Sequence, residues 1–116
     1  MAAALAVALG AFGAHGLKAR LSSEMLDVWQ TAVQYHAWHA LGLLAAGVSG
    51  FHFEGIWIRS AGWLFAAGIV LFSGSLYALA LGAPRALGAV TPLGGLAFIL
   101  GWLALAVGVI YARTSA

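Results

Sequence analysis

Cysteine is absent from this chain of 116 residues, and charged residues are scarce. Without cysteine the chain can form no disulfide, no thiolate metal site and no cysteine nucleophile. Charged residues make up 7% of the chain and hydrophobic residues 64%, against about 45–50% apolar residues in soluble domains. So few charges could not cover the surface of a soluble domain of this length. We therefore expect lipid to surround most of the chain.

Signatures of nucleic-acid binding and of catalysis are also absent. The net charge is +2, but the basic residues are scattered singly, so no nucleic-acid partner is indicated. The spaced glycines Gly10, Gly13 and Gly16 match neither a dinucleotide fingerprint nor a phosphate-binding loop, and close helix contact explains them better. Glu24 and Asp27 are typical of a solvated helix edge. We predict no enzymatic activity and identify no catalytic residue, no metal site and no cofactor.

Long uncharged runs separate the few charges. There are 26 uncharged residues between Asp27 and Glu54, 25 between Arg59 and Arg85, and 27 between Arg85 and Arg113. A helix needs about 20 residues to cross a hydrocarbon core about 30 Å thick, so each run is long enough to span. The sequence thus predicts an all-α integral membrane bundle in one domain, residues 1–116. The expected spans cover about 35–53, 57–82 and 92–112.

The start of the chain predicts a fourth transmembrane helix, a short one over about 2–15. A truncated first span explains its length better than a signal peptide, because no basic residue precedes the apolar run. Between the first two spans, residues of about 22–33 are expected to form an amphipathic helix lying at the membrane interface, with Ser22 or Ser23 as its N-cap.

Small and polar residues within the spans predict how the helices end and pack. Gly82–Pro84 should end the third span. Thr91 as N-cap, with Pro92 in the first turn, should begin the fourth. Ser73 and Ser75 are expected to bond to a carbonyl of their own helix or to a neighbouring helix. Rows of small residues at helical spacing predict close helix contacts. The rows are Gly42, Ala46 and Gly50; Gly62 and Ala66; Gly74, Ala78 and Gly82; and Ala97, Gly101, Ala104, Gly108 and Ala112.

A cluster of polar residues opens the second span, in the stretch WQTAVQYHAWHALGLL. Because consecutive spans run in opposite directions, these residues and the histidine after the first span should lie near the same membrane face. The candidate ligand-binding residues are His15, Gln34, Tyr35, His36 and His39. One interpretation is a site for a metal, haem, quinone or lipid. The other, favoured by the generic spacing, is that these groups hydrogen-bond to backbone carbonyls and interfacial water.

Four motifs, in order along nearly the whole chain, give a family resemblance. They are GAFGAHGL, WQTAVQYHAWHALGLL, LFSGSLYALAL and TPLGGLAFILGWLALA. Together they resemble the bacterial "domain of unknown function 423" family, small multi-pass inner-membrane proteins similar to eukaryotic transmembrane protein 256. The resemblance implies four membrane-spanning helices, no assigned reaction and both termini in the cytoplasm. Family members usually carry further hydrophobic residues before the first motif, which agrees with a short first span here.

These observations predict a non-catalytic bundle in the inner (cytoplasmic) membrane. It would act as a structural or accessory protein by helix packing, as a homo-oligomer or within a larger membrane complex. The alternative is a binder or carrier of a small ligand at the histidine-rich cluster.

Overall fold

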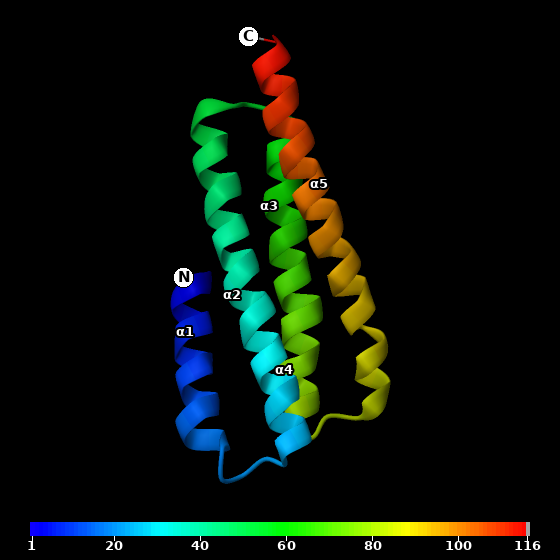
Figure 1. Ribbon diagram of the computed structural model, residues 1–116. Coiled ribbons are helices and arrows are strands. Elements are labelled where there is room, and N and C mark those ends of the chain that lie inside the picture. Colours follow the sequence, from blue (N-terminus) through cyan, green and yellow to red (C-terminus); the bar gives the residue numbers. More distant parts are fainter. Residues whose placement is uncertain (116) are drawn as a thin grey trace.

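The computed structural model describes residues 1–115, and over that range the chain is helical with no strand, so the predicted all-α class is confirmed. The helices form four rods that run alternately up and down (Figure 1). In chain order, the rods are α1 (Ala2–Phe12) with η1 (Gly13–Leu17); α2 (Ser23–His52); α3 (Ile56–Gly68) with η2 (Ile69–Ser73) and α4 (Gly74–Ala80); and η3 (Arg85–Ala89) with α5 (Thr91–Ser115). The η1 and η2 segments are π-helical turns, and η3 is a 3₁₀ turn.

Helix α2 corrects one expectation. Its 30 residues form one continuous helix about 45 Å long, and the separate interfacial helix expected over 22–33 is instead its first third. The Ser22 hydroxyl accepts a hydrogen bond from the Met25 N–H at 3.2 Å, so the predicted cap is confirmed. No glycine or proline occurs in α2 before Gly42, and polar residues alone do not interrupt a helix.

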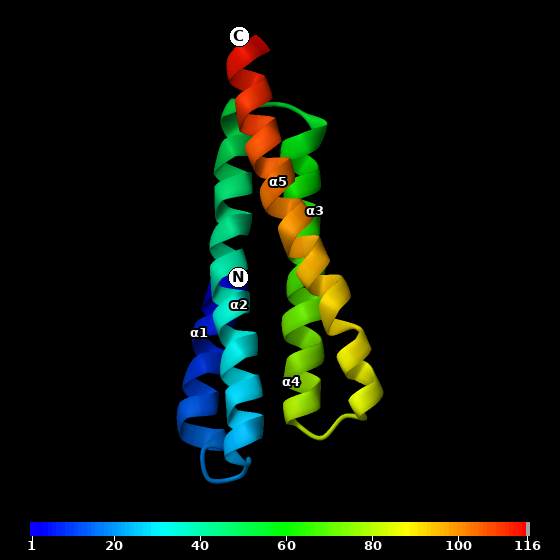
Figure 2. The ribbon, with the colours of Figure 1, turned by 45° about the vertical axis from the view of Figure 1, so that its right-hand side comes forward.

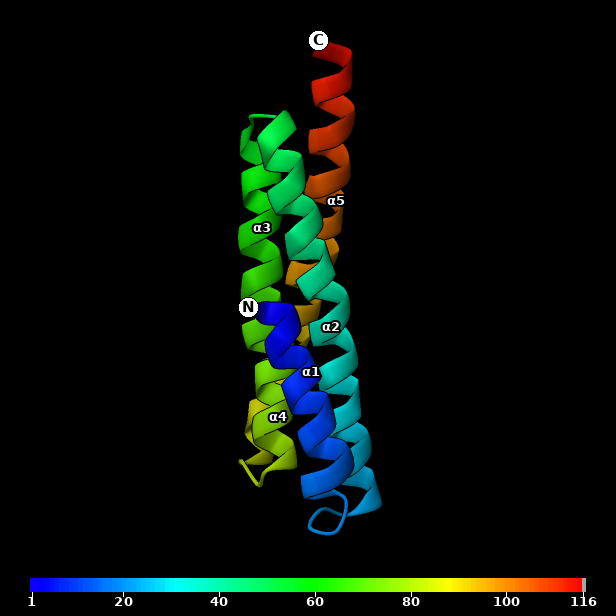
Figure 3. The ribbon, with the colours of Figure 1, turned by 90° about the vertical axis from the view of Figure 1, so that its left-hand side faces the viewer.

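Helix α1 is short and lies along the first half of α2. It begins at mid-height of the bundle and runs toward the end where α2 starts (Figure 3). Together with η1 it is an apolar helical segment, Ala2–Leu17, shorter than a membrane span. Within residues 1–115, two helical segments are long and apolar enough to cross a membrane, Ile56–Ala80 and Arg85–Ser115. The bundle therefore combines these two with one long helix of mixed polarity and one short apolar helix.

The turn after α4 forms at the predicted position. Gly82 has φ 103°, a left-handed conformation that glycine adopts without steric cost. The Ala83 N–H donates to the Ala78 carbonyl at 3.0 Å, and the Gly82 N–H donates to the Leu79 carbonyl at 3.1 Å. This pair of bonds is the Schellman arrangement, which satisfies the last carbonyls of the helix. Pro84 follows, so the chain turns away into η3.

Glycines seven residues apart join α5 to the third rod. At each of them an added Cβ would lie only 2.3–2.8 Å from a side chain or backbone atom of that rod. The pairs are Gly94 with Phe72, Gly101 with Phe65, and Gly108 with Ile58. At one position the glycine belongs to the third rod and the large side chain to α5: Gly68 receives the ring of Phe98. The glycines of α5 and the residues they contact on the third rod both recur every seven residues, in opposite chain directions, so one antiparallel register holds along the whole contact. Helix α5 crosses the third rod at an angle (Figure 2).

This packing confirms one predicted row of small residues and corrects another. Ala97, Gly101, Ala104 and Gly108 of α5 are buried, as expected. The third rod, however, does not use its own row: Gly82 lies exposed in the turn, and an added Cβ at Gly62 would meet nothing within 4 Å. Its contact face is formed instead by Ile58, Ala61, Phe65 and Gly68. Large side chains fill the glycine gaps of the opposite helix, so two rows of small residues need not face each other.

Candidate functional site

His36 lies near the middle of α2 and is buried inside the bundle, with 2% of its surface exposed. Its Nδ1 is 3.0 Å from the Tyr77 hydroxyl of α4, which makes one interhelical hydrogen bond. Its Nε2 is buried with no hydrogen-bond partner among the residues that the structure describes. Leaving such a group unpaired costs about 1–3 kcal/mol. The bond to Tyr77 is therefore the polar interaction that holds this ring.

His39, one turn further along α2, is also buried. Its Nδ1 lies 2.6 Å from the Tyr35 carbonyl oxygen, and since a carbonyl only accepts, Nδ1 carries the hydrogen. The ring stacks on Phe98 of α5, with centroids 3.5 Å apart and planes 10° from parallel. For His39 the sequence-based interpretation of an imidazole bonded to a backbone carbonyl is confirmed.

Further polar side chains join the other helices. The Trp29 indole N–H donates to the Leu9 carbonyl of α1 at 2.9 Å. The Ser73 hydroxyl, fully buried, donates to the Ala32 carbonyl of α2 at 2.7 Å. Each of these bonds ties two rods together, as expected for Ser73. We call the side chains that make interhelical hydrogen bonds the interhelical polar set: Trp29, His36, Ser73, Ser75, Tyr77 and Thr91.

The Ser75–Thr91 contact revises the expected role of Thr91. Their hydroxyl oxygens lie 2.6 Å apart, joining α4 to α5, and Ser75 also bonds to the Phe72 carbonyl in its own rod. At the start of α5 the Val90 carbonyl accepts the first backbone bonds, from Leu93 and Gly94. The Thr91 hydroxyl is thus engaged with Ser75 instead of capping the helix, because η3 leads the chain into α5 without a break.

The five candidate ligand-binding residues do not share one surface. His15 is exposed on η1, Gln34 is exposed on α2, and Tyr35 is half-buried; His36 and His39 face the interior. Two residues advance an α-helix by about 200°, so Gln34 and His36 lie on nearly opposite sides.

The level of the three histidines also differs from the expectation. Gly13 packs against Trp29 and Gly10 against Val33, so the antiparallel register places His15 beyond Trp29, away from His36. Since α2 begins at Ser23, His36 lies near its middle and not at its opening. Within residues 1–115 no three His, Asp or Glu side chains are placed to hold a metal ion. The interpretation of the three histidines as a joint metal site is therefore wrong.

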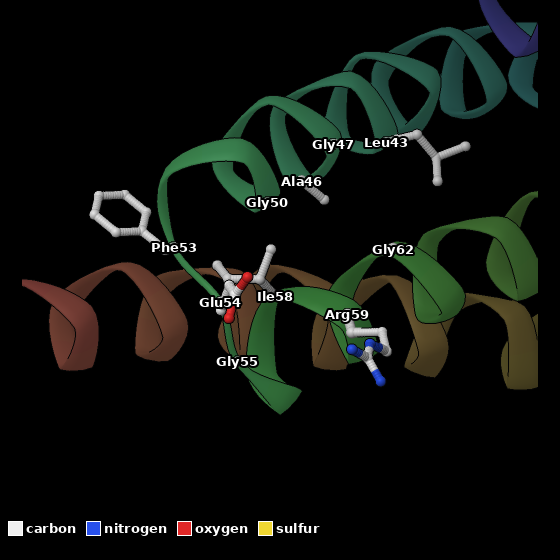
Figure 4. A pocket seen from close by; sticks show the side chains of 10 residues that line it. All are labelled: Leu43, Ala46, Gly47, Gly50, Phe53, Glu54, Gly55, Ile58, Arg59 and Gly62. Atoms are coloured by element: carbon white, nitrogen blue, oxygen red, sulfur yellow. The ribbon is translucent and has the colours of Figure 1, made fainter.

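Pockets open on the surface of the bundle, and two of them lie beside α2. One, of about 450 Å³, lies between α1 with η1 and α2, and Gln30 and Gln34 line it. The other, of about 600 Å³, lies between the end of α2 and the start of α3 (Figure 4). His36 and His39 line neither of them. The second pocket was not expected from the sequence, although Gly47, Gly50 and Gly62 supply its open walls.

Large apolar side chains cover the outside of the bundle. On α2 and α5 the exposed residues include Leu41, Leu44, Val48, Phe51, Leu96, Ile99, Leu103 and Ile110. Contiguous apolar surface of this kind marks contact with lipid or with another protein. Polar groups bonded between helices inside, and apolar side chains outside, define the class of small helical-bundle membrane proteins.

Comparison with known proteins gives the family. Residues 9–95 match the family described as "Protein of unknown function (DUF423)", and the chain belongs to this family. It is 54% identical over 106 residues to the UPF0382 membrane protein YwdK of Bacillus subtilis strain 168, covering 90% of this chain and 86% of the relative. It is 53% identical over 107 residues to a UPF0382 membrane protein of Staphylococcus saprophyticus, covering 91% and 88%. No solved structure matches the chain.

Proposed function

We propose that this protein is a non-catalytic bundle of four spans in the cytoplasmic membrane, the first of them short, and that it acts as a structural or accessory partner. It would pack with further copies of itself or with a larger membrane complex. One observation carries this proposal: the interior polar side chains bond helix to helix, while the outer faces of α2 and α5 remain apolar and uncovered. The polar groups thus stabilise the bundle, and the surface left for function is apolar.

The distribution of charge supports the four-span arrangement. Lys18, Arg20 and Arg85 belong to the turns at one end of the bundle, whereas Arg59 and Arg113 belong to helix ends at the other (Figure 1). Between the two ends the rods carry no charged residue. A charge at the bilayer centre is costly, so this separation suits a bundle whose long axis runs along the membrane normal.

Topology reporters test the position in the membrane. Fusions that end after Gly55 and after the last residue should report the cytoplasm, and a fusion that ends after Ala83 should report the opposite side. The reason is that the third rod, from α3 to α4, carries the chain to one end of the bundle, and α5 carries it back to the other. Reporters after Gly55 and Ala83 on the same side would contradict the four-span bundle.

Photocrosslinking in native membranes tests the accessory role. A photoreactive amino acid at Leu44, which is 63% exposed on α2, should crosslink to a second copy or to a larger complex. The same amino acid at Ala46, which is 5% exposed, is the matched control and should not. If Leu44 and equivalent positions along α5 gave only uncrosslinked monomers, the accessory role would have to be abandoned.

A further inference from the structure

The larger pocket described above, between the end of α2 and the start of α3, is space that the protein leaves unfilled, and we call it the cleft. It measures about 600 Å³, and the Ala46 and Ile58 side chains point into it from opposite helices (Figure 4). A Cβ added at Gly47 or Gly62 would meet no atom within 4 Å. By contrast, Gly94, Gly101 and Gly108 of α5 each lie close against a side-chain or backbone atom of the third rod. Gly47 and Gly62 thus leave open space at the surface beside the packed Ala46 and Ile58. The volume of the cleft lies in the range of pockets that hold small ligands, about 300–1,000 Å³.

Two opposite charges stand at the edge of this cleft. Glu54, in the connection between the helices, and Arg59, in α3, both line it and are exposed. Within the described part of the chain no ion pair joins them to each other or to another residue. The carboxylate and the guanidinium thus stand at the edge of the same cleft, and each is available to a ligand group of opposite charge. The deeper lining, Leu43, Ala46 and the glycines, is apolar.

The edge of the cleft lies at the level of the bundle where lipid headgroups are expected. Exposed Trp57 follows Glu54 by three residues, and indole rings favour the membrane–water interface. Arg113, in the last turn of α5, lies at the same end of the bundle (Figure 1). The inner part of the cleft then points into the acyl-chain region, where lipid chains are the surrounding solvent.

We propose that this cleft binds one phospholipid whose headgroup carries both a phosphate and a primary ammonium group. The phosphate contacts the Arg59 guanidinium, the ammonium contacts the Glu54 carboxylate, and one acyl chain lies between the helices over Gly47 and Gly62. A helix from a second copy fits less well, because an apolar helix would leave both charges without a partner. The proposal rests on the membrane position proposed above and adds a specific ligand class to it.

Native mass spectrometry of the full chain in mild detergent tests the headgroup contacts. The delipidated protein is titrated with phosphatidylethanolamine, or with phosphatidylglycerol, which has the phosphate but no ammonium. We expect one bound phosphatidylethanolamine and about a threefold preference for it, in the range of exposed charge pairs. Glu54→Gln should remove the preference, and Arg59→Gln should weaken binding of both lipids. Arg113→Gln removes a charge at the same end outside the cleft and should change neither.

A second pair of variants tests the acyl-chain position. The double substitution Gly47→Leu with Gly62→Leu fills open space, so the bundle should keep its helical circular dichroism while losing the bound lipid. Ala45→Leu, exposed on α2 outside the cleft, is the matched control and should bind as before.

Several outcomes would overturn the lipid site. One is unchanged binding in the filled variant; another is a dimer that this variant converts to monomer, which would assign the cleft to a second copy. A third is a wild-type protein with the expected topology that retains no phospholipid. That last result would remove the lipid site and leave the four-span bundle standing, so the two proposals fail separately.

Discussion

Replacing Gly94 by alanine should force α5 away from the third rod. The added Cβ would lie 2.3 Å from the Phe72 backbone nitrogen and 2.8 Å from its Cα. Ordinary contact begins near 3.4 Å, so the helices must separate by roughly 1 Å, because backbone atoms cannot rotate aside as a side chain can. Overpacking of this kind costs about 1–3 kcal/mol, against a gain in helix propensity of at most about 1 kcal/mol.

The next residue supplies the control. A Cβ at Gly95 would lie 3.8 Å from the Phe72 ring, an ordinary contact, so Gly95→Ala should be neutral or stabilising. We expect the two variants to differ by about 2 kcal/mol, roughly thirtyfold in the unfolding equilibrium constant. The measurement is reversible unfolding by SDS in mixed micelles, followed by tryptophan fluorescence. Equal unfolding free energies for Gly94→Ala and Gly95→Ala would refute the glycine-contact register.

Two further predictions concern the interhelical polar set. Tyr77→Phe should lower the unfolding free energy by about 1–3 kcal/mol, since it leaves both ring nitrogens of His36 buried and unpaired. Adding His36→Phe should restore part of that loss in the same unfolding assay, and no recovery would argue against the pair. Trp29→Phe removes the bond to the α1 carbonyl and should speed hydrogen exchange within Ala2–Phe12, while Trp38→Phe on the exposed face should not. Equal exchange in both variants would mean that the indole bond does not hold α1.

Local signals predicted the places where the helices begin and end. Ser22 forms the expected cap, and Gly82, two residues before Pro84, ends the third rod as predicted. Both depend on hydrogen bonds between residues a few positions apart, so the sequence alone contains them. The break expected after residue 33 does not form, because polar residues without a glycine or proline among them do not interrupt a helix.

The candidate site was predicted less well, for a physical reason. That His39 bonds to a backbone carbonyl one turn back is a local property and was expected. That His36 meets Tyr77, 41 residues away, depends on the register of α2 against α4. Residue spacing on one helix contains no information on that register. The same limit hid the cleft, because an unfilled space exists only between helices that have already packed.

By itself, the sequence determined that this protein is all-helical, suited to an apolar surrounding and divided by turns at its few charged segments. These properties follow from composition and from contacts within a few residues. Only the tertiary structure decided which face of each helix is buried, that glycines of α5 receive the large side chains of the third rod, and that Glu54 and Arg59 share one cleft. Those outcomes depend on the mutual fit of whole helices, where a shift of one residue turns a helical face by about 100°.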